Sequence, residues 1–172
     1  MMYGWAKSIN WVTRRSFLDN CAMISVFAYY KATNIAETLH FCDLEIFSTA
    51  FVKKDFLTLR KERFKFNNVT RWCVDQVENA DTLSEKINII EKLIKVLIKL
   101  VSMNNFQTSM SILLCLQSLK IERHEWNRIS RSELLNYHEL VYLFSPLKNF
   151  KKLRKRIEES ETNCIPFMGN TD

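Results

Sequence analysis

The chain has 172 residues, of which 47% are hydrophobic. This length and composition suit one domain large enough to bury a core. The net charge is +6. Only two glycines and two prolines occur, so folds built from many tight turns are disfavoured and long helices are favoured. The positive charge is spread along the chain, apart from a cluster at residues 148–156. No RNA-binding aromatic motif, zinc knuckle or basic arm accompanies it, so we predict no nucleic-acid partner and expect the cluster to face an acidic partner or a lipid surface.

The cysteines argue against a disulfide framework and against a metal site. Five occur, at positions 21, 42, 73, 115 and 164, and none are spaced as C-x-x-C. An odd number of cysteines within apolar runs is typical of buried, reduced thiols in a cytoplasmic protein. The histidines His40, His124 and His138 have no metal-ligand spacing with them, and we expect no metal and no cofactor.

The first third of the chain begins with a stretch that could be mistaken for an export signal. Twin arginines, Arg14 and Arg15, precede an apolar run at residues 21–30. Asp19 and Asn20 interrupt the apolar part, and the run that remains is too short to span a bilayer. We therefore interpret it as a core helix within an N-terminal helical extension, residues 1–33.

Residues 82–101 predict a long amphipathic helix. Thr82 and Glu85 are spaced as a capping box, in which each side chain accepts a hydrogen bond from the backbone of the other residue. From there apolar residues recur at intervals of three and four, the period of one helix face. They are Leu83, Ile87, Ile90, Ile94, Leu97 and Val101.

Helices are also predicted on either side of this one. Upstream, residues 34–47 and 66–77 have helical patterns. Downstream, Asn104 or Asn105 can end one helix and cap the next. Residues 106–116 are apolar on nearly every side, which is typical of a helix at the centre of a bundle.

The last third of the chain continues the helical pattern. Ser130 and Glu133 are spaced as a second capping box, opening a helix that we expect Pro146 to end. Residues 149–159 predict a short helix rich in lysine and arginine. No strand-like alternation competes anywhere, so we predict an all-α, single-domain helical bundle.

Motifs of covalent catalysis are absent from the sequence. It contains no G-x-x-x-x-G-K phosphate loop, no G-x-G-x-x-G dinucleotide motif and no G-x-S-x-G nucleophile elbow. We therefore expect the protein not to be an enzyme of the covalent kind, and to act through binding surfaces.

Four stretches, in order from Asn34, carry a recognisable pattern. The first is NIAETLHFCDLEIFSTAFVKKDFL, with I-A-x-x-L, an acidic residue and then E, an apolar residue and F. The second is KFNNVTRW, similar to R-F-N-x-V-S-x-W. The third joins LSEKINIIEKLIKV to MNNFQTSMSILLCLQS, and the fourth joins LFSPLKNFKKLRKRI to CIPFMG. Together they resemble the catalytic domain of Ras-family guanine-nucleotide exchange factors, the Cdc25-homology domain.

The resemblance implies residues that would bind the GTPase. Asn67 matches the motif asparagine beside the groove for the switch II segment of the GTPase, and Gln117 stands where the family has Asn or Gln reaching toward that switch. Arg123 matches a family arginine that is either a contact or structural.

Further implied contacts come from the fourth stretch. Asn149 and Phe150 match a pair on the rim near the nucleotide, and Phe167 matches the aromatic residue of C-[IV]-P-[FYW]. Other matched residues are expected to be structural, in the core or at a helix junction. They are Trp72, Asn104, Asn105 and Phe106.

The implied function is to stimulate GDP release from a Ras-like small GTPase, in the cytoplasm or at the inner membrane surface. In the family the C-[IV]-P-[FYW] motif runs on into a helical hairpin that opens switch I, whereas this sequence departs from the pattern at Asn170. We therefore expect residues 34–172 to form a partial domain without that hairpin, with weakened exchange and poorly covered apolar faces at 106–116 and 164–168. The alternatives are a module that grips the GTPase without exchange, and a helical scaffold that binds no GTPase.

Overall fold

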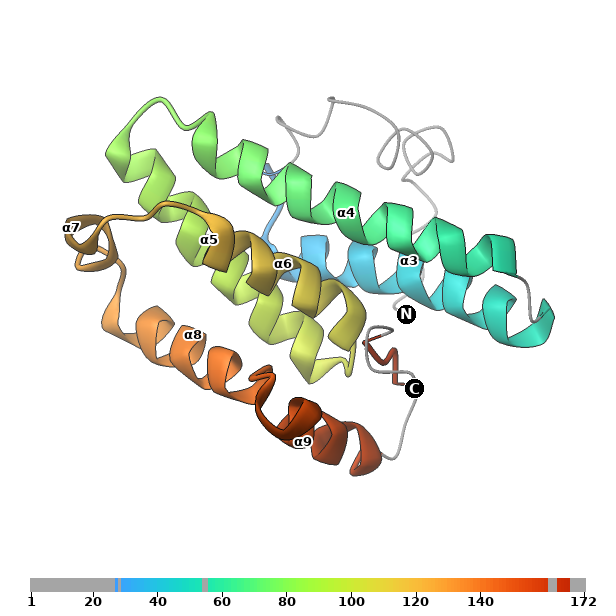
Figure 1. Ribbon diagram of the computed structural model, residues 1–172. Helices are drawn as coiled ribbons and strands as arrows, with labels where there is room; N and C mark the ends of the chain where they lie inside the picture. Colours follow the sequence, from blue (N-terminus) through green and yellow to red (C-terminus); the bar gives the residue numbers. More distant parts are fainter. Residues whose placement is uncertain (1–26, 28, 54–55, 161–163, 168–172) are drawn as a thin grey trace, which may run out of the picture. The chain divides into compact units, whose positions relative to one another are not determined.

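The computed structural model describes residues 27, 29–53, 56–160 and 164–167 (Figure 1). The chain divides into two compact units, Met1–Tyr30 and Lys31–Asp172. Of the first unit only Phe27, Tyr29 and Tyr30 are described. The expected N-terminal extension, with its core helix at 21–30, therefore lies almost entirely outside the described residues.

The described part of the second unit is built from helices joined by short connections. In chain order they are α3 Ala32–Lys53, α4 Phe56–Glu78, α5 Leu83–Ser102, α6 Phe106–Ser118, α7 Arg123–Trp126, α8 Arg131–Leu143 and α9 Leu147–Glu158. The described residues contain no strand, only an isolated bridge between Asn105 and Ile165. The all-α prediction is confirmed.

The two upstream helices are longer than the sequence pattern indicated. The helix expected at 34–47 runs on to Lys53, and the one expected at 66–77 begins at Phe56. No glycine or proline lies in either extension, so nothing in the backbone stops the helix there.

α5 is the predicted amphipathic helix, and it begins directly after Thr82, the predicted N-cap. The Thr82 side chain accepts a hydrogen bond from the Glu85 backbone N–H at 3.1 Å. The Glu85 carboxylate reaches one residue beyond the expected partner and accepts from the backbone N–H of Asp81 at 3.0 Å. The buried face of α5 is formed by Ile87, Ile90, Leu93, Ile94, Val96, Leu97 and Leu100.

α6 lies at the centre, as its apolar sequence predicted. α4 lies along one side of α5 and α6, and α8 and α9 lie along the other (Figure 1). From Phe106 to Leu116 every residue is buried except Leu114, which is 39% exposed. The expectation that residues 106–116 would be poorly covered was therefore wrong, because α4 and α5 enclose them. Ile165 is also buried, while Met168 lies outside the described residues.

Two details at the ends of helices differ from the prediction. Ser130 does precede α8, but its side chain makes no capping hydrogen bond. Instead its backbone N–H donates to the Glu91 carboxylate of α5 at 2.7 Å, so a tertiary contact replaces the local cap. Pro146 does not end α8, which stops at Leu143, but forms the N-cap of α9.

Candidate functional site

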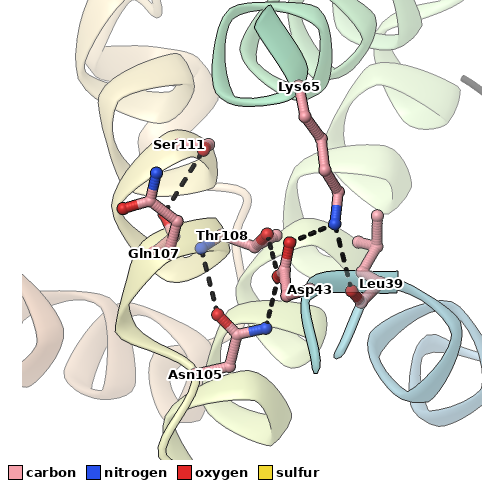
Figure 2. A network of polar contacts seen from close by, with 7 residues as sticks. All are labelled: Leu39, Asp43, Lys65, Asn105, Gln107, Thr108 and Ser111. Atoms are coloured by element: carbon pink, nitrogen blue, oxygen red, sulfur yellow. Dashed lines mark hydrogen bonds and ion pairs between the residues drawn. The ribbon is translucent and has the colours of Figure 1, made fainter. Parts of the chain in front are cut away.

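A buried polar junction joins α3, α4 and the start of α6. The Asp43 carboxylate, with the residue 0% exposed, accepts hydrogen bonds from the Asn105 side-chain amide at 2.5 Å and the Thr108 hydroxyl at 2.6 Å. It also forms an ion pair with the Lys65 ammonium, which is itself buried. Figure 2 shows Asp43 between these three partners. A buried carboxylate is tolerated only when it is paired and hydrogen-bonded in this way.

The same junction anchors the segment that follows α9. Asn105 caps α6, because its side-chain oxygen accepts from the Thr108 backbone N–H at 3.1 Å. Asn104, just before it, has a left-handed backbone with φ of 54°, a conformation that asparagine adopts more readily than most residues. On either side of Asn105, the Ile165 N–H donates to the Asn104 carbonyl at 2.9 Å and the Phe106 N–H donates to the Ile165 carbonyl at 2.8 Å. The C-I-P-F segment is thereby fixed at the start of α6.

This anchoring places Phe167 in an aromatic cluster with Phe66 of α4 and Phe150 of α9. The centre of the Phe167 ring lies 6.1 Å from that of Phe66 and 6.0 Å from that of Phe150, within the range in which aromatic pairs attract. Asn67 follows Phe66 directly and is exposed. The cluster thus brings Phe150 and Phe167 together close to Asn67.

The backbone that carries Phe150 is strained. Lys148, Asn149 and Phe150 have φ values of 54°, 52° and 51°, a run of left-handed residues without a glycine. Each such residue costs about 1–2 kcal/mol, and the strain is compatible with a folded chain only where surrounding contacts hold it. Here the Phe150–Phe167 contact and a 3.4 Å hydrogen bond from the Phe150 N–H to the Pro146 carbonyl hold it.

The other predicted contacts lie at the far end of α6. Gln117 is exposed on its last turn, and Arg123 is the exposed first residue of α7. The Thr70 hydroxyl of α4 donates to the Ser111 carbonyl of α6 at 3.2 Å, and the two helices run side by side in the same direction (Figure 1). From the helical rise, Asn67 and Gln117 are separated along this pair by about 13 Å.

Three of the exposed positions, Asn67, Leu114 and Gln117, are named the contact surface here as the candidate binding site, with the aromatic cluster at the Asn67 end. Within the described part of the chain neither side-chain amide has a hydrogen-bond partner, and both residues are exposed. Leu114 lies about one turn before Gln117 on α6 and is the exposed apolar residue of that helix. Polar groups around an exposed apolar residue are suited to a protein partner.

Comparison with known proteins shows the family of the chain. The model of the RasGEF domain family matches residues 34–171. The chain belongs to the RasGEF domain family.

Named relatives agree with this assignment. Over 106 residues the chain is 30% identical to Ras guanine nucleotide exchange factor W of Dictyostelium discoideum, covering 60% of this chain and 9% of that protein. Human Ras-specific guanine nucleotide-releasing factor RalGPS2 is 33% identical over 108 residues, 61% of this chain and 18% of that protein. Human Rap guanine nucleotide exchange factor 1 is 26% identical over 151 residues, 81% of this chain and 14% of that protein. The chain thus spans less than a fifth of the length of each.

Sequence reasoning did not single out Asp43 and Lys65, the charged centre of this RasGEF domain. A signal was present, since Asp43 follows Ile35 and Leu39 at intervals of four and so falls on the buried face of α3. A charged residue on an apolar helix face predicts a buried partner. Which residue would supply the opposite charge depended on the packing of α3 against α4.

The RasGEF domain contains a deeply buried thiol, that of Cys73, which is 0% exposed. Among the described cysteines, Cys73 and Cys115 are buried, as predicted, whereas Cys42 and Cys164 are only partly buried. Cys21 lies outside the described residues. Burial, and a hydrogen bond with Cys115, raise the pKa of the Cys73 thiol well above its ordinary value, so it stays protonated and unreactive.

Neither a metal site nor a membrane span is found in the part of the chain that the structure covers. The described histidines, cysteines and acidic residues nowhere gather into a group of three or more that could hold a metal ion. Each described helix lacks the length or the apolar character needed to cross a membrane.

Proposed function

We propose that this chain binds a Ras-like small GTPase and stimulates the release of its GDP. The observation that carries the proposal is the RasGEF family match over residues 34–171. The contact surface supports it, because Asn67 and Gln117, two residues that the family pattern assigns to the GTPase, are both exposed. A partner of this kind would place the protein in the cytoplasm.

The proposed activity requires binding energy and no covalent chemistry. Phosphate and Mg²⁺ contacts order the switch segments of a GTPase. A protein that binds the nucleotide-free arrangement more tightly than the GDP-bound one must weaken GDP binding by the same factor, because linkage is reciprocal. Each tenfold loss of GDP affinity requires about 1.4 kcal/mol of differential binding.

Binding is tested first, with a panel of Ras-subfamily GTPases immobilised both nucleotide-free and GDP-loaded. We expect at least one member to bind the chain in the nucleotide-free form more tightly than in the GDP form. The double variant Asn67→Ala, Gln117→Ala should weaken this binding by about tenfold or more. Lys95→Ala, an exposed change on α5, is the matched control and should bind as the parent does. If no GTPase binds in either form, the proposal is wrong.

Exchange is tested separately, by following release of fluorescent GDP from the GTPase that binds. Faster release in proportion to the added chain supports the proposed activity, and the Asn67→Ala, Gln117→Ala variant should reduce that acceleration. Tight binding with unchanged release would overturn the exchange activity and favour a module that grips the GTPase without expelling nucleotide.

A further inference from the structure

α9 presents an unusually basic face. Its twelve residues, LKNFKKLRKRIE, contain six basic side chains and one acidic side chain. Of the basic residues only Lys152 is partly buried, and the other five are exposed. Within the described part of the chain, the ion pair that these side chains form, Lys155 to Glu159 at 3.6 Å, is exposed on both sides and neutralises little of this charge.

The opposite side of α9 is docked on the domain, so the charges must face away from it. Leu153 is completely buried, and Phe150 contacts Phe167 within the aromatic cluster. α9 also packs against α8. The basic side chains therefore form an outer surface rather than part of the core.

Large apolar side chains are exposed beside these charges. Leu147, the first residue of α9, is 77% exposed, and Tyr142 near the end of α8 is 65% exposed. The Lys152 ammonium lies over the Tyr142 ring, which ties the basic and apolar parts together. Leu135, 58% exposed, lies seven residues before Tyr142 on the same face of α8. A single exposed apolar residue is ordinary, but here Tyr142 and Leu147 lie beside a helix with six cations, and Leu135 extends the exposed apolar side chains along α8.

We propose that this lipid-facing surface, formed by Leu135, Tyr142, Leu147 and the basic residues of α9, binds the anionic surface of a phospholipid membrane. Lysine and arginine attract anionic headgroups, while leucine and tyrosine side chains enter the boundary between headgroups and acyl chains. Charge complementarity alone would also fit an acidic protein. The exposed Leu147 and Tyr142 favour lipid, because apolar side chains beside cations can enter the boundary between headgroups and acyl chains.

This binding is distinct from the proposed function and can occur together with it. The lipid-facing surface belongs to α8 and α9, whereas Asn67 and Gln117 belong to α4 and α6. The two surfaces approach each other where Phe150 of α9 enters the aromatic cluster. Membrane attachment through α8 and α9 would leave the Gln117 end of the contact surface free.

The test is co-sedimentation of the chain with vesicles of phosphatidylcholine, alone or with added phosphatidylserine. We expect binding to the phosphatidylserine vesicles that weakens as salt is raised, and little binding to phosphatidylcholine alone. Lys151→Glu with Arg154→Glu should reduce binding by about tenfold or more. Leu147→Ala should also reduce it at constant charge, which a purely electrostatic contact would not predict.

A matched control separates a specific surface from general positive charge. Lys95→Glu with Lys120→Glu makes the same change in net charge at exposed positions on α5 and after α6, and should bind vesicles nearly as the parent does. Equal losses in both double variants would overturn the proposal, as would sedimentation with neither vesicle. Salt-sensitive binding to a polyglutamate peptide without vesicle binding would instead indicate an acidic protein partner. Thermal melts confirm that each variant is folded.

Discussion

Two polar regions of this domain contain the same kinds of side chain and use them for opposite purposes. In the polar junction, Asp43 and Asn105 are 0% exposed. The Asn105 amide donates to the Asp43 carboxylate, and the Asn105 side-chain oxygen accepts from the Thr108 backbone N–H. On the contact surface, Asn67 and Gln117 are exposed, and within the described residues their amides have no partner. A polar group whose bonds are satisfied inside the fold contributes to stability, and one left open to solvent is available to another protein.

Two asparagines of the family motifs, Asn105 and Asn67, lie in different surroundings. Both are motif asparagines, yet Asn105 caps a helix and fixes the segment before Phe167, while Asn67 stands on the outer side of α4. Substitutions in the junction should therefore reduce stability first and binding only as a consequence. Substitutions on the contact surface should reduce binding with little change in stability.

The largest effect is expected from Asp43→Asn. The variant keeps the size of the side chain but leaves the buried Lys65 ammonium without its counter-charge, and breaking a buried pair in this way typically costs about 3–5 kcal/mol. We expect a large fall in the free energy of unfolding, measured by urea denaturation. The matched control is Asp75→Asn on the exposed side of α4, which should change stability by less than about 0.5 kcal/mol.

A double variant identifies the cause of that loss. Lys65→Met removes the unpaired charge, so Asp43→Asn with Lys65→Met should regain much of the stability lost by Asp43→Asn alone. If the single variant is no less stable than Asp75→Asn, the polar junction does not have the structural role assigned to it.

An intermediate effect is expected from Phe167→Ala, which lies where the two regions meet. The change removes both aromatic contacts of Phe167, each worth about 0.5–1.5 kcal/mol, and releases the strained turn at Phe150. We expect a stability loss of about 1–3 kcal/mol together with weaker binding to the nucleotide-free GTPase. Thermal melts and a binding titration measure the two quantities on the same sample.

Phe41→Ala is the control for loss of a ring. Phe41 is 54% exposed on α3 and belongs to neither region, so its removal should leave GTPase binding unchanged. Should Phe167→Ala bind as the parent does, the aromatic cluster serves stability alone and belongs with the junction.

Much of the fold could be predicted from the sequence because its signals are local. The cap at Thr82, the spacing of apolar residues through α5 and the apolar character of α6 all depend on neighbours within a few residues. The details that were mispredicted depend on distant residues. Glu91, far from Ser130 in sequence, satisfies the backbone at the start of α8, and no local pattern announces such a partner.

The candidate site, too, could be predicted from the sequence only in part. The family pattern indicated Asn67, Gln117, Phe150 and Phe167, but not that Phe150 and Phe167 would meet while Gln117 lies at the other end of α6. It also did not indicate the ion pair of Asp43 with Lys65 or the left-handed turn at 148–150. These features arise when α4, α6 and α9 pack together, and the sequence of one helix does not contain that information.

The smallest effect concerns pH and tests whether the surroundings of the junction contribute to stability. Burial lowers the pKa of His40 from its ordinary value of 6.5, the nearby Asp43 charge raises it by less, and Lys65 lowers it further. In the unfolded chain His40 therefore binds its proton at a higher pH than in the folded chain, so protonation favours unfolding. The free energy of unfolding should fall as pH decreases through about 6.5 and level off below the folded pKa. Urea midpoints across this range measure the slope, which His40→Gln should remove and His138→Gln, at an exposed position, should leave in place.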